Sequence, residues 1–403
     1  MGARAVSDAP AGPRAAVLLK QGKEGPIRAG HPWIFSGAIE AVEGEPEAGA
    51  AVRVLAADGS LLGVGTFHPR GSIAVRLVAR EEVPIDGRLV AARLGEAAAL
   101  RRSLGLLTPE GACRLVNGEG DSLPGVVIDV YAGWAVLQLL TAGAERLRAE
   151  VLEALAGAIS PRGVLERSAG GVRRDEGLAD RCGRALGEDP PERIEIREGG
   201  DRYLVDPRRG QKTGFFLDQR PARSLLRSLS GGRRVLNAFA YTGAFAIAAA
   251  RGGASHVCSV ETSGPAVALA REAWVRNGLE AERAEWVVGD AFEVLAKAGR
   301  SWDLIVLDPP PFARHRADRE RALRAYRDLN RRALRALEPG GLLLTFSCSP
   351  HVARELFEHV VATSAGRRDR LQILARLGAG PDHPVLAAHI EGEYLTGLLV
   401  RRL

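Results

Sequence analysis

The sequence predicts an α/β protein whose C-terminal half is a doubly wound parallel sheet and whose N-terminal part is mostly β. Three observations carry this prediction. Beyond Asp201, apolar segments of strand length alternate with segments of helix length, as in a parallel sheet with helices on both faces. Several of those strands end in an acidic residue, at the edge where doubly wound sheets bind ligands. Before about residue 84 the chain has short strands broken by glycine turns.

The first 84 residues are expected to form a tail and a small module. Residues 1–14 are rich in Ala, Gly and Pro and have no apolar segment, so they predict a tail and not a signal peptide. Residues 15–84 predict a mixed or barrel-like β module. The early aromatics Trp33 and Phe35 are expected to pack in its core, with stacking on a base as the alternative. Hairpin signals at Asp58-Gly59 and Arg70-Gly71 separate three expected strands: Val52–Leu55, Leu61–Phe67 and Ile73–Val78.

Residues 85–200 predict a central α+β domain. Helices are expected over residues 88–104 and 144–158, and strands Val126–Tyr131 and Ala135–Leu140 are expected to pair across Ala132-Gly133. The paired prolines after Asp189 predict a boundary, because proline continues neither a helix nor an inner strand.

Residues 201–403 predict the doubly wound, Rossmann-like domain. The arginines between Ala313 and Glu338 predict a solvated helix with local ion pairs. The arginines directly after Phe312 are also candidates for contacts with RNA phosphates. The expected buried strands are Arg234–Asn237, His256–Val260, Ala284–Val288, Leu304–Leu307 and Leu342–Phe346.

Composition narrows the class of protein further. The chain has 403 residues, enough for two or three domains, and a net charge of +6, which permits a polyanionic partner without requiring one. No apolar run reaches the length of a membrane span. No C-x-x-C pair occurs, so neither a disulfide framework nor a zinc site is expected and a reducing compartment is favoured. The four cysteines are Cys113, Cys182, Cys258 and Cys348.

Four strand ends carry residues suited to a nucleoside. The first strand leads into a turn that ends in a glycine and opens a helix, with Asn237, Tyr241, Thr242 and Gly243 as candidate contacts. Glu261 follows about twenty residues later, where an acid can accept both ribose hydroxyls. Asp290 is expected at the adenine amino group, and Asp308 ends the fourth strand. Each acid alone could merely cap the next helix. No G-x-G-x-x-G or G-K-[ST] segment occurs there, so S-adenosylmethionine fits best.

Cys348, directly after the fifth strand, is the candidate nucleophile; an inert half-buried thiol is the alternative. Carbon 5 of a pyrimidine attacks a methyl sulfonium only after a thiolate has added at carbon 6. Asp308 could serve the N3/N4 edge of the base, and Glu391 is the candidate base for the carbon 5 proton, or else an exposed turn acid. The target base must leave its stack to reach such a crevice.

These motifs resemble the bacterial 23S rRNA cytosine-C5 methyltransferases that carry an N-terminal PUA domain. The likeness covers almost the whole chain, and its most specific segments are Lys212–Arg220, Phe346–Ser349 and Asp382–Pro384. It implies a PUA fold for residues 15–84, a nucleophilic Cys348, and a cytoplasmic, dimeric enzyme acting on large-subunit ribosomal RNA. It also implies that segment Lys212–Arg220 closes over the cofactor. Cofactor contacts are implied for Gln219 and Arg220, and substrate contacts for Lys212, Pro309, Phe312 and Arg314.

The sequence departs from that family at three points. Glu261 stands where relatives often have Asp, and Pro311 and Arg314 replace the more usual residues after the Asp-Pro-Pro motif. The motif before Pro309 lacks the second cysteine of other RNA cytosine-C5 methyltransferases, so one thiol must do all the covalent work. Two rival functions remain: methylation of a base nitrogen in guanine or adenine, which needs no thiol, and a non-catalytic RNA-binding assembly factor.

Overall fold

The computed structural model describes residues 13–313, 315–366 and 369–403, so most of the expected N-terminal tail lies outside the described residues. The chain forms two compact units. The first comprises residues 1–109, 113–190 and 382–392, and the second comprises 110–112, 191–381 and 393–403. Within the described ranges, no helix is both long and apolar enough to cross a membrane.

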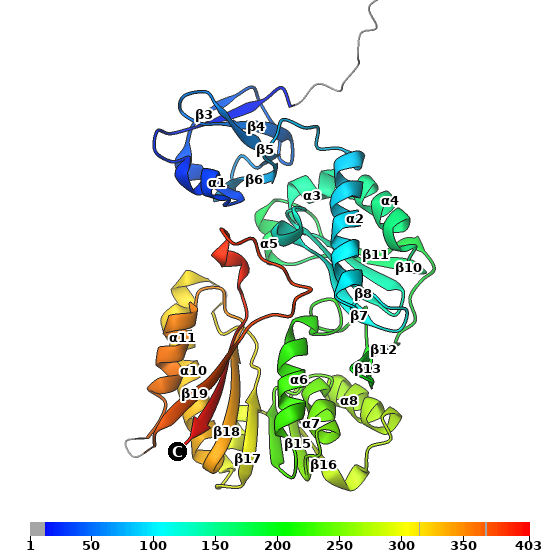
Figure 1. Ribbon diagram of the computed structural model, residues 1–403, viewed down its shortest axis with the longest axis vertical. Helices are drawn as coiled ribbons and strands as arrows, with labels where there is room; N and C mark the ends of the chain where they lie inside the picture. Colours follow the sequence, from blue (N-terminus) through cyan, green and yellow to red (C-terminus); the bar gives the residue numbers. More distant parts are fainter. Residues whose placement is uncertain (1–12, 314, 367–368) are drawn as a thin grey trace, which may run out of the picture. The chain divides into compact units, whose positions relative to one another are not determined.

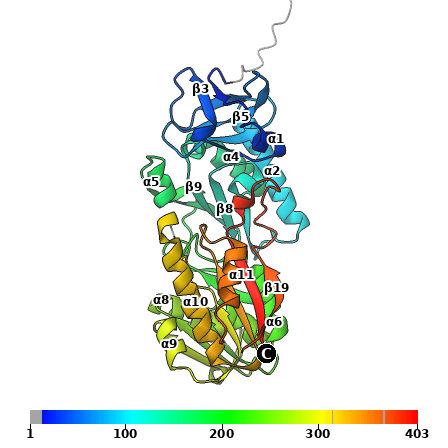
Figure 2. The same cartoon turned by 90° about the vertical axis from the view of Figure 1, so that its left-hand side faces the viewer.

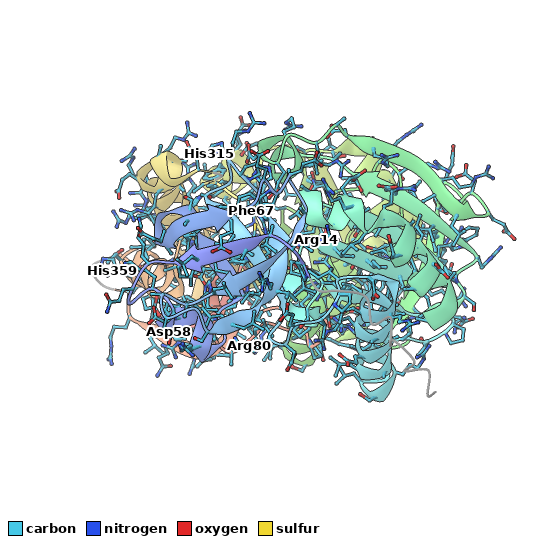
Figure 3. The ribbon with its side chains drawn as sticks, turned by 90° about the horizontal axis from the view of Figure 1, so that it is seen from above. Arg14, Asp58, Phe67, Arg80, His315 and His359 are labelled. Atoms are coloured by element: carbon cyan, nitrogen blue, oxygen red, sulfur yellow. The ribbon has the colours of Figure 1, made fainter. Side chains whose placement is uncertain are left out.

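The first unit begins with a six-stranded sheet in the order β2-β6-β5-β4-β1-β3. The three strands expected from the sequence are confirmed as β4, β5 and β6, which pair antiparallel. Asp58 lies in the turn between β4 and β5 (Figure 3) and accepts hydrogen bonds from the amide and hydroxyl of Ser60. The elements are β1 (Ala16–Leu19), α1 (Gly25–Ala29), β2 (Trp33–Phe35), β3 (Ile39–Glu43), β4 (Ala51–Leu55), β5 (Leu61–Phe67) and β6 (Ile73–Ala79).

The two early aromatics of this module differ in burial. Ile34, between them, belongs to the core, whereas Trp33 is half-buried and donates from Nε1 to Glu119 at 2.8 Å. Phe35 is 46% exposed. The expectation that Trp33 packs in the core is therefore met only in part. The expectation that Phe35 is buried is wrong, because the strand places its side chain on the solvent side of the sheet.

The rest of the first unit is a five-stranded sheet, β11-β10-β9-β8-β7, with helices α2 and α4 packed together. Asp86 caps α2 through the amides of Arg88 and Leu89. The single helix expected over 144–158 is wrong: the chain leaves helical geometry at Leu147 and forms two helices. The elements are α2 (Gly87–Ser103), β7 (Ala112–Asn117), β8 (Val126–Tyr131), β9 (Trp134–Leu139), α3 (Ala142–Arg146), α4 (Arg148–Ile159), β10 (Gly163–Ser168), α5 (Gly171–Asp175) and β11 (Arg181–Gly187).

The second unit is built on a seven-stranded sheet in the order β16-β15-β14-β17-β18-β20-β19 (Figure 1). The five strands expected from the sequence, β14 to β18, are confirmed and run parallel. The expectation that all five are buried is wrong for β16, which is a half-exposed strand at the edge of the sheet. A hairpin of β12 and β13 precedes them. The elements are β12 (Ile194–Glu198), β13 (Asp201–Val205), α6 (Arg220–Leu229), β14 (Arg234–Ala238), α7 (Ala244–Arg251), β15 (His256–Glu261), α8 (Gly264–Arg276), β16 (Ala284–Val288), α9 (Ala291–Lys297), β17 (Trp302–Leu307), α10 (Arg319–Ala336), β18 (Leu337–Ser347), α11 (Arg354–Ala362), β19 (Leu371–Leu377) and β20 (Thr396–Arg402).

The sheet is not wholly parallel, which corrects the expectation. Strand β20 pairs antiparallel with both β18 and β19. A parallel neighbour needs a crossover connection, usually a helix, and the segment between β19 and β20 is a loop with only one short 3-10 turn. Helices α9, α10 and α11 cover one face of the sheet, and α7 and α8 cover the other (Figures 1 and 2). Burial on both faces explains the continuous apolar strands and leaves polar side chains to the strand ends.

Candidate active site

A pocket of about 590 Å³ opens at the carboxyl ends of the five parallel strands of the second unit. This is the position at which doubly wound sheets bind ligands. Its lining comes from the turn after each strand, from residues 211–223 and from residues 394 and 395. The lining residues are Gln211, Lys212, Phe215, Phe216, Asp218, Gln219, Arg223, Phe239, Ala240, Tyr241, Thr242, Ala244, Phe245, Glu261, Thr262, Asp290, Phe292, Asp308, Pro309, Pro310, Pro311, Phe312, Cys348, Tyr394 and Leu395.

Glu261 ends β15 and is held by backbone donors. Its Oε2 accepts from the amide of Tyr241 at 2.9 Å, and its Oε1 accepts from the amide of Ser263 at 2.9 Å and the hydroxyl of Thr262 at 3.1 Å. These bonds fix the carboxylate at the pocket wall. Each carboxylate oxygen has two acceptor sites, so capacity remains for a ligand hydroxyl.

Asp290 lies after β16 and is exposed at the pocket. Its Oδ1 accepts from the amides of Phe292 and Glu293, at 2.6 and 3.3 Å, and so caps α9. Asp290 therefore does cap the following helix, which was the alternative interpretation of this acid. Both bonds go to one oxygen, and among the described residues no donor is assigned to Oδ2, so capping and ligand binding are compatible.

The turn after β14 contributes Tyr241 and Thr242 to the pocket but neither Asn237 nor Gly243. Asn237 is fully buried within the sheet. Gly243 has φ +76°, and an added Cβ would lie 2.8 Å from the Cβ of Ala270. The backbone conformation and the close packing against Ala270 therefore both require glycine at this position. A cofactor contact at Gly243, expected from the sequence, stays a prediction.

Segment 211–219 forms one wall of the pocket and is linked to the chain just before β20. Lys212 forms an ion pair with Asp218, and Tyr394 donates its hydroxyl to the same Asp218 oxygen at 2.6 Å. Lys212 adopts φ +52°, a left-handed conformation that a non-glycine residue keeps only where its surroundings enforce it. Arg220, which ends this segment, does not line the pocket: it bonds to the carbonyl of Ala112 and to Glu198.

Asp308 and Gln219 meet inside the pocket. The Nε2 of Gln219 donates to Oδ1 of Asp308 at 3.0 Å. Burial, followed by the nearby charge of Asp218, raises the pKa of Asp308 to about 7, against the lowering effects of Lys212 and the Gln219 bond. A carboxyl group with such a pKa can both hold and release a proton near neutrality.

Cys348 follows β18 and faces the pocket between two inward-facing serines. Ser347 and Ser349 are buried, and Ser349 bonds to the hydroxyl of Tyr326 at 2.9 Å. The Cys348 Sγ lies 3.7 Å from the carbonyl oxygen of Pro309. Burial, and next the charge of Asp308, raises the pKa of the thiol to about 12. The thiol and the Asp308 carboxyl therefore share one crevice, and each disfavours negative charge on the other.

Aromatic rings continue the wall beside these two groups. Phe292 has its ring centroid 6.1 Å from that of Phe312 and 6.4 Å from that of Phe239. Pro309 lines the same side, while Arg314 lies outside the described residues. Aromatic faces of this kind can stack on a flat base.

Comparison with known proteins assigns this architecture to a family. The model of the S-adenosylmethionine-dependent methyltransferases matches residues 125–396, and that of a PUA-like domain matches residues 17–80. The chain belongs to the S-adenosylmethionine-dependent methyltransferases. It is 41% identical to the ribosomal RNA large subunit methyltransferase I of Tolumonas auensis, over 96% of this chain and 99% of that protein. The relative of the same name from Erwinia tasmaniensis is 38% identical, over 96% and 98%.

The fold also matches a solved structure. A Streptococcus mutans protein described as a SAM-dependent methyltransferase superposes on 96% of this chain and 99% of its own, with a TM-score of 0.82 and 22% identity. The cofactor of this methyltransferase family is S-adenosylmethionine. The pocket fits that molecule: it has carboxylates at three strand ends, an aromatic wall and no phosphate-binding loop.

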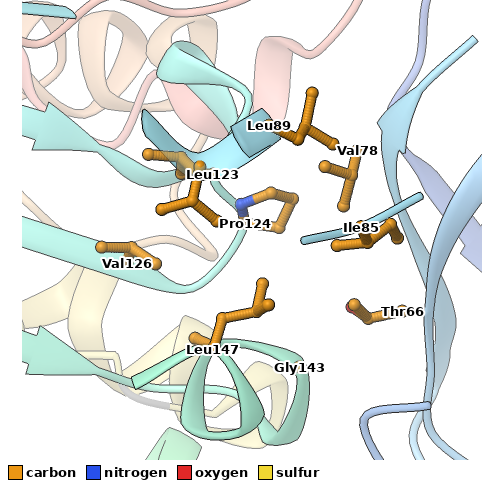
Figure 4. A pocket seen from close by; sticks show the side chains of 11 residues that line it. Thr66, Val78, Ile85, Leu89, Leu123, Pro124, Val126, Gly143 and Leu147 are labelled. Carbon is orange, nitrogen blue, oxygen red and sulfur yellow. The ribbon is translucent and has the colours of Figure 1, made fainter. Parts of the chain in front are cut away.

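Two other features of this methyltransferase lie in its first unit. Glu391 is not part of the pocket lining; its Oε2 is 3.2 Å from Nε2 of His31. A second hollow, lined by Thr66, Val78, Leu123, Leu147 and their neighbours (Figure 4), has a volume of about 10 Å³. That is room for one water molecule among mainly apolar side chains, so it is a packing gap and not a ligand site.

Sequence reasoning missed several residues of the pocket. Asp218 lies in the Lys212–Arg220 segment, but its hydrogen bond to Tyr394 joins parts of the chain that are 176 residues apart. Arg223, 3% exposed, is held by Glu198 through two 2.7 Å bonds and donates to the carbonyl of Phe216. Nothing in its local sequence distinguishes it from the other arginines of an amphipathic helix.

Proposed function

We propose that this methyltransferase transfers a methyl group from S-adenosylmethionine to carbon 5 of a cytosine in 23S ribosomal RNA, through a covalent bond between Cys348 and carbon 6. The observation that carries the proposal is the shared crevice: Cys348 and Asp308 line the pocket that also contains Glu261 and Asp290. The full-length relatives that are named ribosomal RNA large subunit methyltransferase I support the choice of RNA.

Each strand-end residue has a proposed task in binding. Glu261 accepts hydrogen bonds from the ribose hydroxyls. Asp290 accepts a hydrogen bond from the adenine amino group through Oδ2, the oxygen that does not cap α9. Tyr241, Thr242 and Gln219 complete the cofactor wall. On the substrate side, Phe312 and Pro309 hold the flipped base, and Lys212 holds a phosphate or carbonyl oxygen.

In the proposed reaction, Asp308 carries one proton from the Cys348 thiol to N3 of the cytosine and later returns it. Asp308 takes the proton from the Cys348 thiol and delivers it to N3 as Sγ bonds to carbon 6, so the addition is neutral overall. Carbon 5 becomes nucleophilic, and bound S-adenosylmethionine supplies the electrophilic methyl group. Loss of the carbon 5 proton to a base then re-forms the double bond to carbon 6 and expels Sγ, and the N3 proton returns through Asp308 to the sulfur. Glu391 was expected from the sequence to be that base, but it does not line the pocket, so the proposal leaves the base unassigned.

The raised pKa values fit this order of events. A thiol with a pKa of about 12 stays protonated at rest and is protected from adventitious alkylation. Its proton leaves only when Asp308, with a pKa of about 7, can accept it. A pair that shares one proton avoids two adjacent negative charges.

The experiment uses the purified full-length chain, methyl-labelled S-adenosylmethionine and 23S rRNA lacking the modification. We expect 5-methylcytidine at one position by nucleoside mass spectrometry. RNA that contains 5-fluorocytidine should form a denaturation-resistant adduct with the wild type, because fluorine cannot leave as a cation, and no adduct with Cys348→Ala. Methylated guanine or adenine, or full activity of Cys348→Ala, would favour base-nitrogen methylation. Absence of any heat on titration with S-adenosylmethionine would favour the assembly-factor alternative.

The homodimer and the cytoplasmic location stay predictions. Light scattering coupled to gel filtration tests the first. Fractionation of cells that express the tagged full chain tests the second.

A further inference from the structure

Helix α10 carries an excess of positive charge. Its 18 positions hold seven arginines and two acidic residues, Glu320 and Asp328. The PUA-like region, from which RNA binding is expected, is close to neutral: residues 17–80 contain seven basic and six acidic side chains. The charge that attracts RNA phosphates is therefore not concentrated in that region.

The α10 arginines divide into two groups by their partners. Arg319 pairs with Glu320, Arg321 pairs with Asp318, and Arg331 and Arg332 both pair with Asp328. Arg332 also donates to the carbonyl of Phe292 and so has a structural role. In contrast, Arg324, Arg327 and Arg335 are exposed and have no carboxylate within ion-pair distance among the described residues. We call these three residues the α10 stripe.

The stripe lies on one face of the helix. Spacings of three and eight residues, with Arg331 between, bring the side chains into line. At about 1.5 Å per residue the stripe spans roughly 16 Å, or four to five nucleotides at about 3.4 Å per nucleotide along one strand of a duplex. Like charges at these spacings destabilise a helix, and a polyanion would relieve that repulsion.

The helix starts beside the pocket. Strand β17 ends at Leu307, residues 308–312 line the pocket, and α10 begins at Arg319. The helix then returns along the outer face of the sheet, next to α9 and α11 (Figure 2), to the start of β18. A strand that follows the stripe therefore leads to the carboxyl edge of the sheet, where Cys348 and Asp308 lie.

We propose that the α10 stripe binds the sugar–phosphate backbone of the RNA substrate and supplies a main part of the electrostatic attraction of the enzyme for RNA. The inference rests on the proposed function for the class of substrate. The stripe contacts phosphates only, so it contributes affinity and register and no sequence preference.

The test compares two triple variants of the full-length protein. Arg324→Gln/Arg327→Gln/Arg335→Gln removes three charges, and Arg324→Lys/Arg327→Lys/Arg335→Lys keeps them; Arg, Lys and Gln have similar helix propensities. The probe is a fluorescein-labelled 20-nucleotide oligocytidylate, titrated by fluorescence anisotropy from 50 to 300 mM KCl. Thermal unfolding of both variants checks that each is folded.

We expect the slope of log Kd against log salt to fall by about 2 in the Gln variant, because each lost phosphate contact on a single strand removes about 0.7. The Lys variant should keep the wild-type slope. With rRNA as substrate, the Gln variant should raise KM and keep kcat and S-adenosylmethionine affinity, since the stripe lies outside the pocket. A Gln variant with the wild-type slope and KM would overturn the assignment of RNA binding to the α10 stripe, and so would an equal fall in slope in the Gln and Lys variants. Either result would leave the proposed function intact. Salt-dependent binding through the stripe without methyl transfer by the wild type would instead overturn the proposed function.

Discussion

Replacing Glu261 with Gln gives a sharp test of the cofactor site, because the structure makes this isosteric change severe. Glu261 accepts bonds on both oxygens, from the amide of Tyr241 on one and from Ser263 and Thr262 on the other. A glutamine side chain has only one acceptor oxygen. Whichever way its amide turns, the NH₂ group faces a backbone N–H, and two donors oppose each other.

The expected loss follows from the bonds involved. A hydrogen bond to a charged group contributes about 1.5–3 kcal/mol. Loss of one charged bond to the ribose, at about 2 kcal/mol, weakens S-adenosylmethionine roughly 30-fold. Displacement of the Tyr241 turn adds to this loss, because Tyr241 holds φ +47° while its amide is bonded to Glu261. We therefore expect the dissociation constant of Glu261→Gln to rise by at least about 30-fold.

Isothermal titration with S-adenosylmethionine measures this effect. The control is Glu293→Gln, the same chemical change on an exposed position of α9 outside the pocket lining. Thermal unfolding reports whether the variant is folded. A dissociation constant within about threefold of the wild type, in a folded Glu261→Gln protein, would refute the assignment of Glu261 to the ribose.

Three further predictions concern the other acids. Asp290→Ala should weaken S-adenosylmethionine by more than about tenfold, measured by the same titration; Asp290→Ser keeps a capping oxygen and separates loss of the α9 cap from loss of the ligand contact. Asp308→Asn should raise the melting temperature of the ligand-free protein at pH 8 and not at pH 4.5. The reason is that the folded pKa of about 7 exceeds the unfolded value of 3.8, so stability falls as the pH rises between these values, by an order of a few kcal/mol at most; an equal shift at both pH values would contradict this reading. Glu391→Gln should leave kcat within about threefold, because Glu391 pairs with His31 and does not line the pocket; a loss of about 100-fold would restore Glu391 as the base for the carbon 5 proton.

Much of the fold was predictable because four of the five parallel strands, β14, β15, β17 and β18, are buried along most of their length. Such strands read as continuous apolar segments, and this signal also found β16, although β16 is an edge strand with no buried residue. The antiparallel β19 and β20 were not predicted. Their partners are set by the path of residues 378–395, part of which belongs to the first unit, and strand order is a long-range property that local periodicity does not encode.

The candidate site was predictable to a similar extent. Residues that end a parallel strand must lie at one edge of the sheet, so Glu261, Asp290, Asp308 and Cys348 line one pocket. Asn237 lies one residue before the end of β14, where its side chain is fully buried within the sheet. Arg220 and Glu391 were expected at the site from short stretches of sequence, and a short stretch does not say which way a side chain points.

The sequence by itself determined the α/β class, the kind of cofactor and the strand end at which the candidate thiol lies, because periodicity and strand-end chemistry are local properties. Tertiary structure alone decided which groups act on one another. The Gln219–Asp308 bond spans 89 residues and the Tyr394–Asp218 bond spans 176. The pKa of Asp308 depends on burial and on charges brought together only by folding. Electrostatic energies follow distance and desolvation in space, and separation along the chain fixes neither of them.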